Sequence, residues 1–167
     1  RLVAVELANA ARLQGDARRA YQDFVATGGR CEPWSVAALE SDVIVDALYG
    51  TGLARPVTGE AAAMIEDANA AGRPIVAVDV PSGLHADSGA VLGVAARASL
   101  TVTFIGRKAG LYLGEGAEYS GRVAFDSLGV PAATYTGAAP VARLLGEQDV
   151  LEALPRRRRA AHKGDFG

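Results

Sequence analysis

The sequence predicts an α/β fold in which a sheet of mostly parallel strands has helices on both faces. Short runs of almost entirely apolar residues alternate with longer segments whose apolar residues recur at helical spacing. Strands that are apolar on both sides are typical of parallel sheets, because helices cover both faces. Half of the 167 residues are hydrophobic and 22% are charged, which indicates a folded domain rather than a disordered chain.

The residue pattern of the N-terminal half predicts two strands and two helices. Residues 2–7 read as a short buried strand, and residues 11–27 as a helix that ends at a pair of glycines. Residues 43–45 are β-branched throughout and predict a second strand, which ends at Asp46. The helix predicted over 58–71 begins with a threonine that can cap it and stops before a glycine and a proline.

The residue pattern of the C-terminal half predicts further strands of the same sheet. Residues 75–78 form the third strand, which ends at Asp79. Residues 100–105 form a strand in which Leu, Val and Phe alternate with threonine, and residues 122–125 form a shorter one. A last turn or short helix is predicted within residues 142–154.

Composition excludes several classes of function. The net charge is −2, so bulk charge favours neither nucleic acid nor membrane as a partner, and no apolar run is long enough to cross a bilayer. The four arginines within residues 155–161 are interpreted as a solvated linker. The only cysteine, Cys31, is interpreted as a small packing residue, and a cytoplasmic location is expected.

Two aspartates follow apolar strands and are the first candidate site residues. Asp46 and Asp79 lie about one strand–helix–strand unit apart, so both should face the same edge of the sheet on neighbouring strands. Ligands of open α/β sheets bind at this carboxyl edge. An aspartate there can also simply cap the following turn, and the residues alone leave the two interpretations about even.

Glycine turns follow both aspartates. Gly50 and Gly52 would let the backbone approach a phosphate closely. The dinucleotide fingerprint would need a third glycine at position 55, where Arg55 stands instead, and this argues against a conventional nicotinamide-dependent oxidoreductase. Lys108, in the loop after residues 100–105, is expected to reach the same edge, whereas His85 is expected to face solvent.

Four segments together resemble the epimerase domain of bifunctional NAD(P)H-hydrate repair enzymes, in the order of that family and over almost the whole chain. They are Val45-Asp46-Ala47-Leu48-Tyr49-Gly50-Thr51-Gly52-Leu53, Val76-Ala77-Val78-Asp79-Val80-Pro81-Ser82-Gly83-Leu84, Thr101-Val102-Thr103-Phe104-Ile105 with Lys108 and Gly110-Leu111, and Phe125-Asp126-Ser127-Leu128-Gly129. The end of the chain, residues 162–167, resembles the opening of the ADP-dependent dehydratase domain of the same enzymes.

The resemblance implies a Rossmann-like three-layer α/β/α fold and epimerisation at carbon 6 of hydrated NADH or NADPH. It implies a potassium ion held by Asp46 and Ser82, and a catalytic, substrate-binding carboxylate at Asp79. It also implies a substrate loop made of Gly50, Thr51, Gly52, Leu53, Ala54, Arg55 and Pro56. The expected domains are an epimerase domain over residues 1–154 and, over residues 155–167, a basic linker with the start of a dehydratase domain.

The resemblance also implies that part of the family pattern lies outside this sequence. Family members carry an Asn-Asn-Gly-Gly-Asp loop after their first strand, and this chain begins about where their second strand starts. The first strand–helix unit is therefore expected to be missing, and the fragment alone is expected to have little activity. A non-catalytic scaffold of the same fold is the main alternative, and the oligomeric state stays open, a homo-oligomer included.

Overall fold

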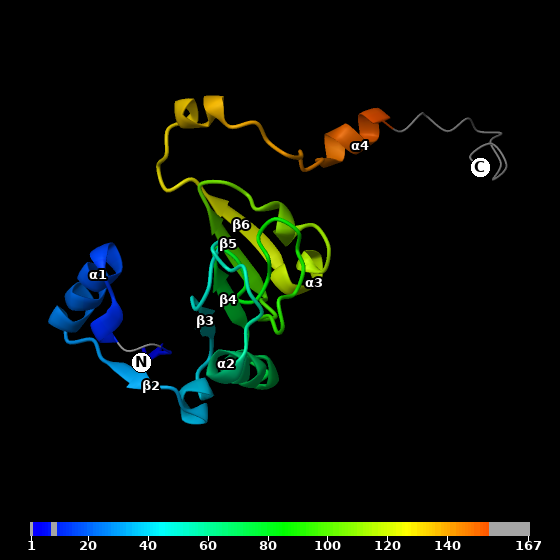
Figure 1. The fold of residues 1–167 in the computed structure, drawn as a ribbon. Helices are drawn as coiled ribbons and strands as arrows, with labels where there is room; N and C mark the ends of the chain where they lie inside the picture. The colour runs from blue at the N-terminus through cyan, green and yellow to red at the C-terminus, as the bar shows by residue number, and fades with distance from the viewer. Residues whose placement is uncertain (1, 8–9, 154–167) are drawn as a thin grey trace. The chain divides into compact units, whose positions relative to one another are not determined.

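The computed structural model describes residues 2–7 and 10–153 (Figure 1). Contacts divide the chain into a larger unit, Arg1–Thr134, and a smaller one, Tyr135–Gly167. The predictions for the linker over residues 155–161 and for the segment 162–167 lie outside the described residues.

The described strands form two parallel sheets, which confirms the predicted α/β class. The larger sheet has the order β3-β4-β5-β6, with every neighbouring pair parallel (Figure 1). Its strands are β3 (Ile44–Asp46), β4 (Ile75–Val78), β5 (Leu100–Phe104) and β6 (Arg122–Asp126). The smaller sheet pairs β1 (Ala4–Glu6) with β2 (Cys31–Pro33).

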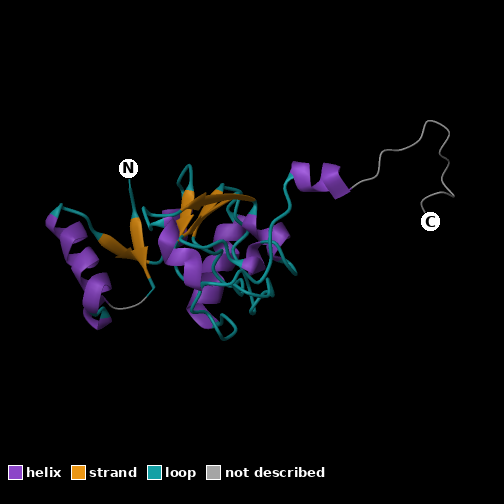
Figure 2. Cartoon of the chain, turned by 90° about the horizontal axis from the view of Figure 1, so that it is seen from above, coloured by secondary structure: helices purple, strands orange, loops and turns teal. Residues whose placement is uncertain are grey.

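Helices follow most of these strands along the chain, but β4 is followed by β5 with only a loop between them. Figure 2 draws the helices in purple and the strands in orange. The α-helices are α1 (Gly15–Ala26), α2 (Gly59–Ala70), α3 (Gly116–Ser120) and α4 (Glu147–Ala153). Short 3₁₀ helices cover Ala10–Arg12, Val36–Leu39, Ala109–Leu111 and Ala132–Gly137. Each predicted helix and strand is therefore present, with ends that differ by a few residues.

Some local predictions were wrong. The first predicted helix is interrupted, because a 3₁₀ turn precedes α1, which begins at Gly15. The predicted cap at Thr58 occupies the N-cap position of α2, but its hydroxyl makes no capping hydrogen bond. Strand β2 and helix α3 were not predicted, because a three-residue strand ending in proline and a five-residue helix contain too few residues to establish a period.

The two faces of the larger sheet differ in exposure. Ile75 and Ala77 lie on one face and are 2% and 0% exposed. Val45 and Val78 lie on the opposite face, because side chains alternate along a strand, and they are 62% and 37% exposed. The buried core of the described residues therefore lies on the Ile75 side.

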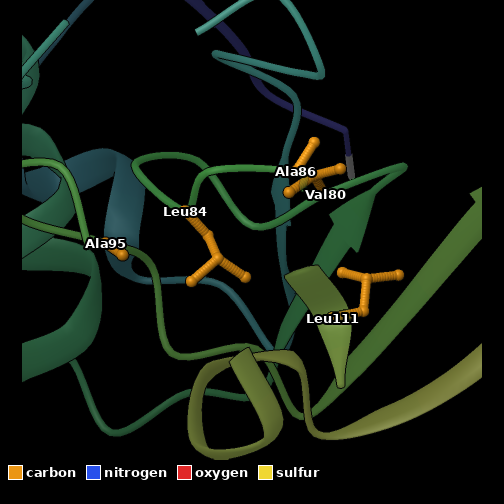
Figure 3. Close-up of a cluster of buried hydrophobic side chains, with 5 residues drawn as sticks. All are labelled: Val80, Leu84, Ala86, Ala95 and Leu111. Carbon is orange, nitrogen blue, oxygen red and sulfur yellow. The ribbon is translucent and has the colours of Figure 1, made fainter. Parts of the chain in front are cut away.

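Two apolar clusters hold the loops at the carboxyl edge of this sheet. The first, formed by Val80, Leu84, Ala86, Ala95 and Leu111, anchors the loop that follows β4 (Figure 3). The second, formed by Val57, Ala61, Ile65 and Ala96, has Leu48, Tyr49 and Leu53 of the loop after β3 packed against it. Both loops that carry predicted site residues are thus fixed by burial of their own apolar side chains.

Candidate functional site

Asp46 and Ser82 meet across the carboxyl ends of β3 and β4. The two residues are 7% and 0% exposed. The Ser82 hydroxyl donates to Oδ1 of Asp46 at 2.5 Å, and the Ser82 backbone N–H donates to Oδ2 at 2.7 Å. Because β3 and β4 are neighbouring parallel strands, this confirms that the two loops share one edge of the sheet. The predicted pair of metal ligands is therefore in direct contact.

Tyr49 adds backbone atoms to the same cluster. Its N–H donates to the Ser82 Oγ at 2.9 Å, and its carbonyl oxygen lies 3.4 Å from that Oγ. The hydroxyl has one proton, which the shorter contact with Asp46 takes. Two oxygens from two loops, the Ser82 hydroxyl and the Tyr49 carbonyl, thus converge beside the buried Asp46 carboxylate.

This oxygen cluster fits an alkali cation by its chemistry. Carboxylate, hydroxyl and carbonyl oxygens are hard ligands, and the carboxylate forms no ion pair within the described residues. The same part of the chain holds no group of three His, Cys, Asp or Glu side chains of the kind that divalent and transition metals use. Burial raises the pKa of the Asp46 carboxyl, against the hydrogen bonds from Ser82 and Leu48, and a nearby cation would favour the ionised form.

Asp79 follows β4 and lies between the ends of β4 and β5. Its Oδ1 accepts hydrogen bonds from the Lys108 ammonium at 2.5 Å, from the Thr103 hydroxyl at 3.1 Å and from the Phe104 N–H at 3.1 Å. Lys108 therefore reaches the predicted edge. The side chains of Lys108 and Asp79 are 17% and 24% exposed, so the ion pair is mostly shielded but not sealed from solvent.

The two aspartates differ in the direction of their pKa shifts. Burial alone would raise the pKa of Asp79, but the hydrogen bonds from Lys108 and Phe104 and the Lys108 charge outweigh it. The pKa of Asp79 therefore lies below its ordinary value, whereas that of Asp46 lies above it. Asp79 is consequently ionised at neutral pH, at the end of a strand, in a partly open position.

The predicted substrate loop is mostly exposed. Six of its seven residues are exposed on the surface, and Leu53 is half-buried against the second apolar cluster. Neither Gly50 nor Gly52 has a positive φ, and a Cβ at either position would meet no atom within 4 Å. The fold itself therefore does not require these two glycines, unlike Gly83, where a Cβ would lie 1.8 Å from the Val94 carbonyl oxygen.

The remaining residues that the sequence analysis considered lie outside the two aspartate clusters. The Nδ1 of His85 lies 3.2 Å from the Ser88 N–H and 3.1 Å from its hydroxyl, so the ring belongs to a local turn. His85 is half-buried rather than fully exposed. Cys31 is a half-buried free thiol, and Arg55 is exposed.

Thr103 is a site residue that the sequence analysis missed. Both Thr101 and Thr103 are fully buried, whereas the apolar residues of β5 are half-buried. Each hydroxyl has a partner, Ser120 O for Thr101 and Asp79 for Thr103, which offsets the burial of a polar group. The alternation of threonine with apolar residues along β5 shows that the threonines share one face of the strand, but it does not indicate that this face is the buried one.

The site residues lie in the part of the chain that matches a known family. Residues 1–110 match the family described as YjeF-related protein N-terminus, and they include both aspartates, Ser82, the glycine loop and Lys108. The chain belongs to this family. The resemblance inferred from the four sequence segments is thereby confirmed.

Curated relatives of this YjeF-type chain carry related names. The chain is 43% identical over 128 residues to a bifunctional NAD(P)H-hydrate repair enzyme of Coxiella burnetii, a match that covers 77% of this chain and 26% of the relative. It is 38% identical over 163 residues to the enzyme of the same name from Vibrio cholerae, covering 97% and 33%. It is 54% identical over 84 residues to an NAD(P)H-hydrate epimerase of Limosilactobacillus fermentum, covering 50% and 40%.

The YjeF-type chain thus spans about a quarter to a third of the length of the bifunctional relatives. Within its described residues, every helix is too short or too polar to cross a bilayer.

Proposed function

We propose that this chain interconverts the two epimers of hydrated NADH or NADPH at carbon 6 of the nicotinamide ring. Family membership and the names of the relatives support this reaction. The observation that carries it is the Asp79 carboxylate, which is ionised, partly exposed and fixed by three donors at the carboxyl edge of a parallel sheet.

The reaction needs a group that handles protons near carbon 6. The ring nitrogen lone pair can expel the carbon 6 hydroxyl once that hydroxyl is protonated, and this leaves a planar iminium ion that water attacks from either face. Asp79 is the proposed acid–base group: its carboxylate stabilises the cationic ring and accepts the proton of the entering water. A proton is also needed for the hydroxyl as it departs.

The loop after β3 is proposed to hold the rest of the substrate. Gly50, Thr51, Gly52, Leu53, Ala54, Arg55 and Pro56 follow a strand at the same edge as Asp79. No atom lies within 4 Å of where a Cβ would stand at Gly50 or Gly52, so a ligand can approach the backbone closely, and Arg55 offers a fork of donors. Both features suit the phosphates of a dinucleotide.

Potassium is proposed as the cofactor, held by Asp46 and Ser82 with the Tyr49 carbonyl. Bound there, it would supply a fixed positive charge beside the substrate loop and would balance the buried Asp46 carboxylate. A dehydratase domain is the proposed partner within the longer protein, because the Coxiella and Vibrio relatives are named as bifunctional.

The proposed function is tested by following conversion of the R to the S hydrate by NMR or chromatography, with and without potassium. The assay uses the full-length protein that contains this sequence, and Asp79→Asn serves as the matched inactive variant. We expect conversion faster than the spontaneous rate, and loss of about 10²–10⁴-fold in the variant. A folded full-length protein that gives no acceleration would favour a non-catalytic scaffold, and normal turnover by Asp79→Asn would remove the role of that carboxylate.

A further inference from the structure

Strands β4 and β5 end in the same rare backbone conformation. The Val80 N–H donates to the Val78 carbonyl at 3.0 Å around Asp79, whose φ is 72°. The Gly106 N–H donates to the Phe104 carbonyl at 2.6 Å around Ile105, whose φ is 64°. Each is a γ-turn with a positive central φ, a strained class, and neither central residue is glycine. Strain of this kind concentrates at functional sites.

The paired turns bring Lys108 and Asp79 together. The first turn places Asp79 against β5, where its N–H donates to the Val102 carbonyl at 2.7 Å. The second reverses the chain after β5 and returns Lys108 to the strand end, where its ammonium also donates to the Phe104 carbonyl at 2.8 Å. The ion pair is thus held by the backbone of two neighbouring strands.

All three hydrogen bonds to the Asp79 side chain end on Oδ1. Lys108, Thr103 and the Phe104 N–H occupy that oxygen, and Oδ2 accepts no hydrogen bond from any described residue. A carboxylate oxygen accepts two to three donors, so Oδ1 is saturated. Oδ2 is the free acceptor of this carboxylate.

The Lys108 ammonium has one N–H that no described residue accepts, just as Asp79 has one free acceptor oxygen. Its ammonium carries three N–H groups, and the described residues take two of them, through Asp79 Oδ1 and the Phe104 carbonyl. The side chain is 17% exposed, so the third N–H has access to the open edge. A free acceptor and a free proton donor therefore lie within one ion pair.

No other charged side chain of the described residues competes for this pair. The other charged groups at the strand ends have partners elsewhere: Asp46 bonds to Ser82, Asp126 to the Leu128 N–H, and Arg107 to the Tyr112 hydroxyl with the Phe125 ring 5.2 Å away.

We propose that Lys108 is the proton donor to the departing carbon 6 hydroxyl, and that Lys108 and Asp79 work as an acid and base pair. This inference rests on the proposed function. It assigns the two proton transfers to two atoms of one ion pair, the Lys108 Nζ and the Asp79 Oδ2, which is the carboxylate oxygen not bonded to Lys108.

The transfers balance in atoms and charge. A Lys108 N–H bond breaks as the hydroxyl oxygen gains the proton; the C6–O bond breaks with its electron pair on the departing water, and the nitrogen lone pair forms the C6=N double bond. The positive charge moves from Lys108 to the ring while Asp79 stays anionic beside both. When water adds, its proton passes to Asp79 and then to the Lys108 amine, which restores the ion pair.

The decisive experiment compares Lys108→Arg with Lys108→Met in the full-length protein. Arginine keeps a positive charge beside the Asp79 carboxylate but does not release a proton at ordinary pH, so it separates proton donation from ion pairing. The readouts are kcat and KM for epimerisation across pH, and the Asp79 carboxyl titration followed by ¹³C NMR. Arg107→Gln is the matched control, because it removes the neighbouring charge without touching the pair.

We expect kcat to fall about 100-fold or more in both variants, with KM changed far less, and the alkaline limb of the wild-type pH profile to disappear. The Asp79 pKa should stay low in Lys108→Arg and rise in Lys108→Met, and Arg107→Gln should match the wild type. Wild-type kcat in Lys108→Arg would overturn the proposal and leave Lys108 an ion-pair partner only. Absence of epimerisation in the wild type would instead remove the proposed function, while the NMR titration would still report on the pair.

Discussion

The Asp46 carboxylate is a buried acid whose hydrogen bonds all come from uncharged donors. Ser82 supplies two of them, and the Leu48 N–H lies 3.4 Å away. Holding an ionised group in such a place is unfavourable unless a cation compensates. The residue is therefore poorly explained as a contribution to stability alone.

Asp46→Asn is expected to separate cation binding from folding. The amide has the same shape, and its NH₂ can donate to the Ser82 hydroxyl while its oxygen accepts from the Ser82 N–H. We expect the thermal midpoint without potassium to be equal to or higher than that of the wild type. The rise in midpoint when potassium replaces sodium should be lost, since only the carboxylate pairs with the ion. A full potassium response in the variant would contradict this role.

Asp79 should make folding sensitive to acid. Its pKa is lower in the folded chain than its ordinary value of 3.8, so the folded state binds protons less well than the unfolded state. The stabilisation is present above that ordinary value and is lost as pH falls through the lower folded value. Asp79→Asn should cost about 1–3 kcal/mol at neutral pH, because Lys108 loses its partner, and nearly nothing in strong acid. Urea unfolding of both proteins at several pH values measures the difference.

At the residue level, the strand pattern alone indicated Asp46 and Asp79, because polar residues that follow apolar strands are distinctive, and the family resemblance added Ser82. It did not assign Thr103 to the site or identify the partner of Lys108. The first contact depends on the γ-turn at Asp79 and the second on the γ-turn at the β-branched Ile105, and local propensity disfavours a positive φ at both residues.

The loop between β3 and α2 contains glycines that the folded chain does not need. We expect Gly50→Ala and Gly52→Ala to change the free energy of unfolding by less than about 0.5 kcal/mol. The same changes should raise KM by about tenfold, the equivalent of one hydrogen bond to the substrate, because a methyl group covers the backbone donors. Unchanged KM in both variants would remove the loop from the proposed substrate site.

Gly83→Ala is the matched contrast to those loop variants. Its φ of +91° and the close Val94 carbonyl leave no room for a side chain. A loss of more than about 2 kcal/mol in denaturant unfolding is expected.

The γ-turn after β5 allows a direct test of strain. Ile105 is 48% exposed, so replacing it loses little packing. Ile105→Gly should leave stability unchanged or raise it by about 1 kcal/mol, because relief of the positive φ offsets the entropy cost of glycine. Ile105→Ala keeps the strain and is the control. Thermal unfolding of the two variants measures the difference. A thermal midpoint of Ile105→Gly well below that of Ile105→Ala would show that the turn is not strained.

Elements were predictable where a period could be established. Strand β4 was predicted with its observed ends, and α2 to within one residue at each end. The ends of α1 and the existence of β2 and α3 were not, because their boundaries are set by tertiary contacts rather than by a repeating pattern.

For the molecule as a whole, stability should depend on one face of the larger sheet. Ile75→Ala opens space on the buried face and is expected to cost about 2–5 kcal/mol. Val45→Ala, on the exposed face of the neighbouring strand, should cost less than about 0.5 kcal/mol in this chain. Equal losses would mean that both faces are covered in solution.

Asp46 is the last residue of β3, and its bonds to Ser82 require one particular alignment of β3 with β4. Sliding β3 by a single residue would turn Asp46 to the opposite face and leave the Ser82 hydroxyl without its acceptor. The Asp46–Ser82 pair therefore favours one register of β3 against β4. In a shifted register the buried Ser82 hydroxyl would lack a hydrogen-bond partner, whereas in the observed register it has one. Asp46 and Ser82, the proposed potassium ligands, thus also help to specify the register of the sheet.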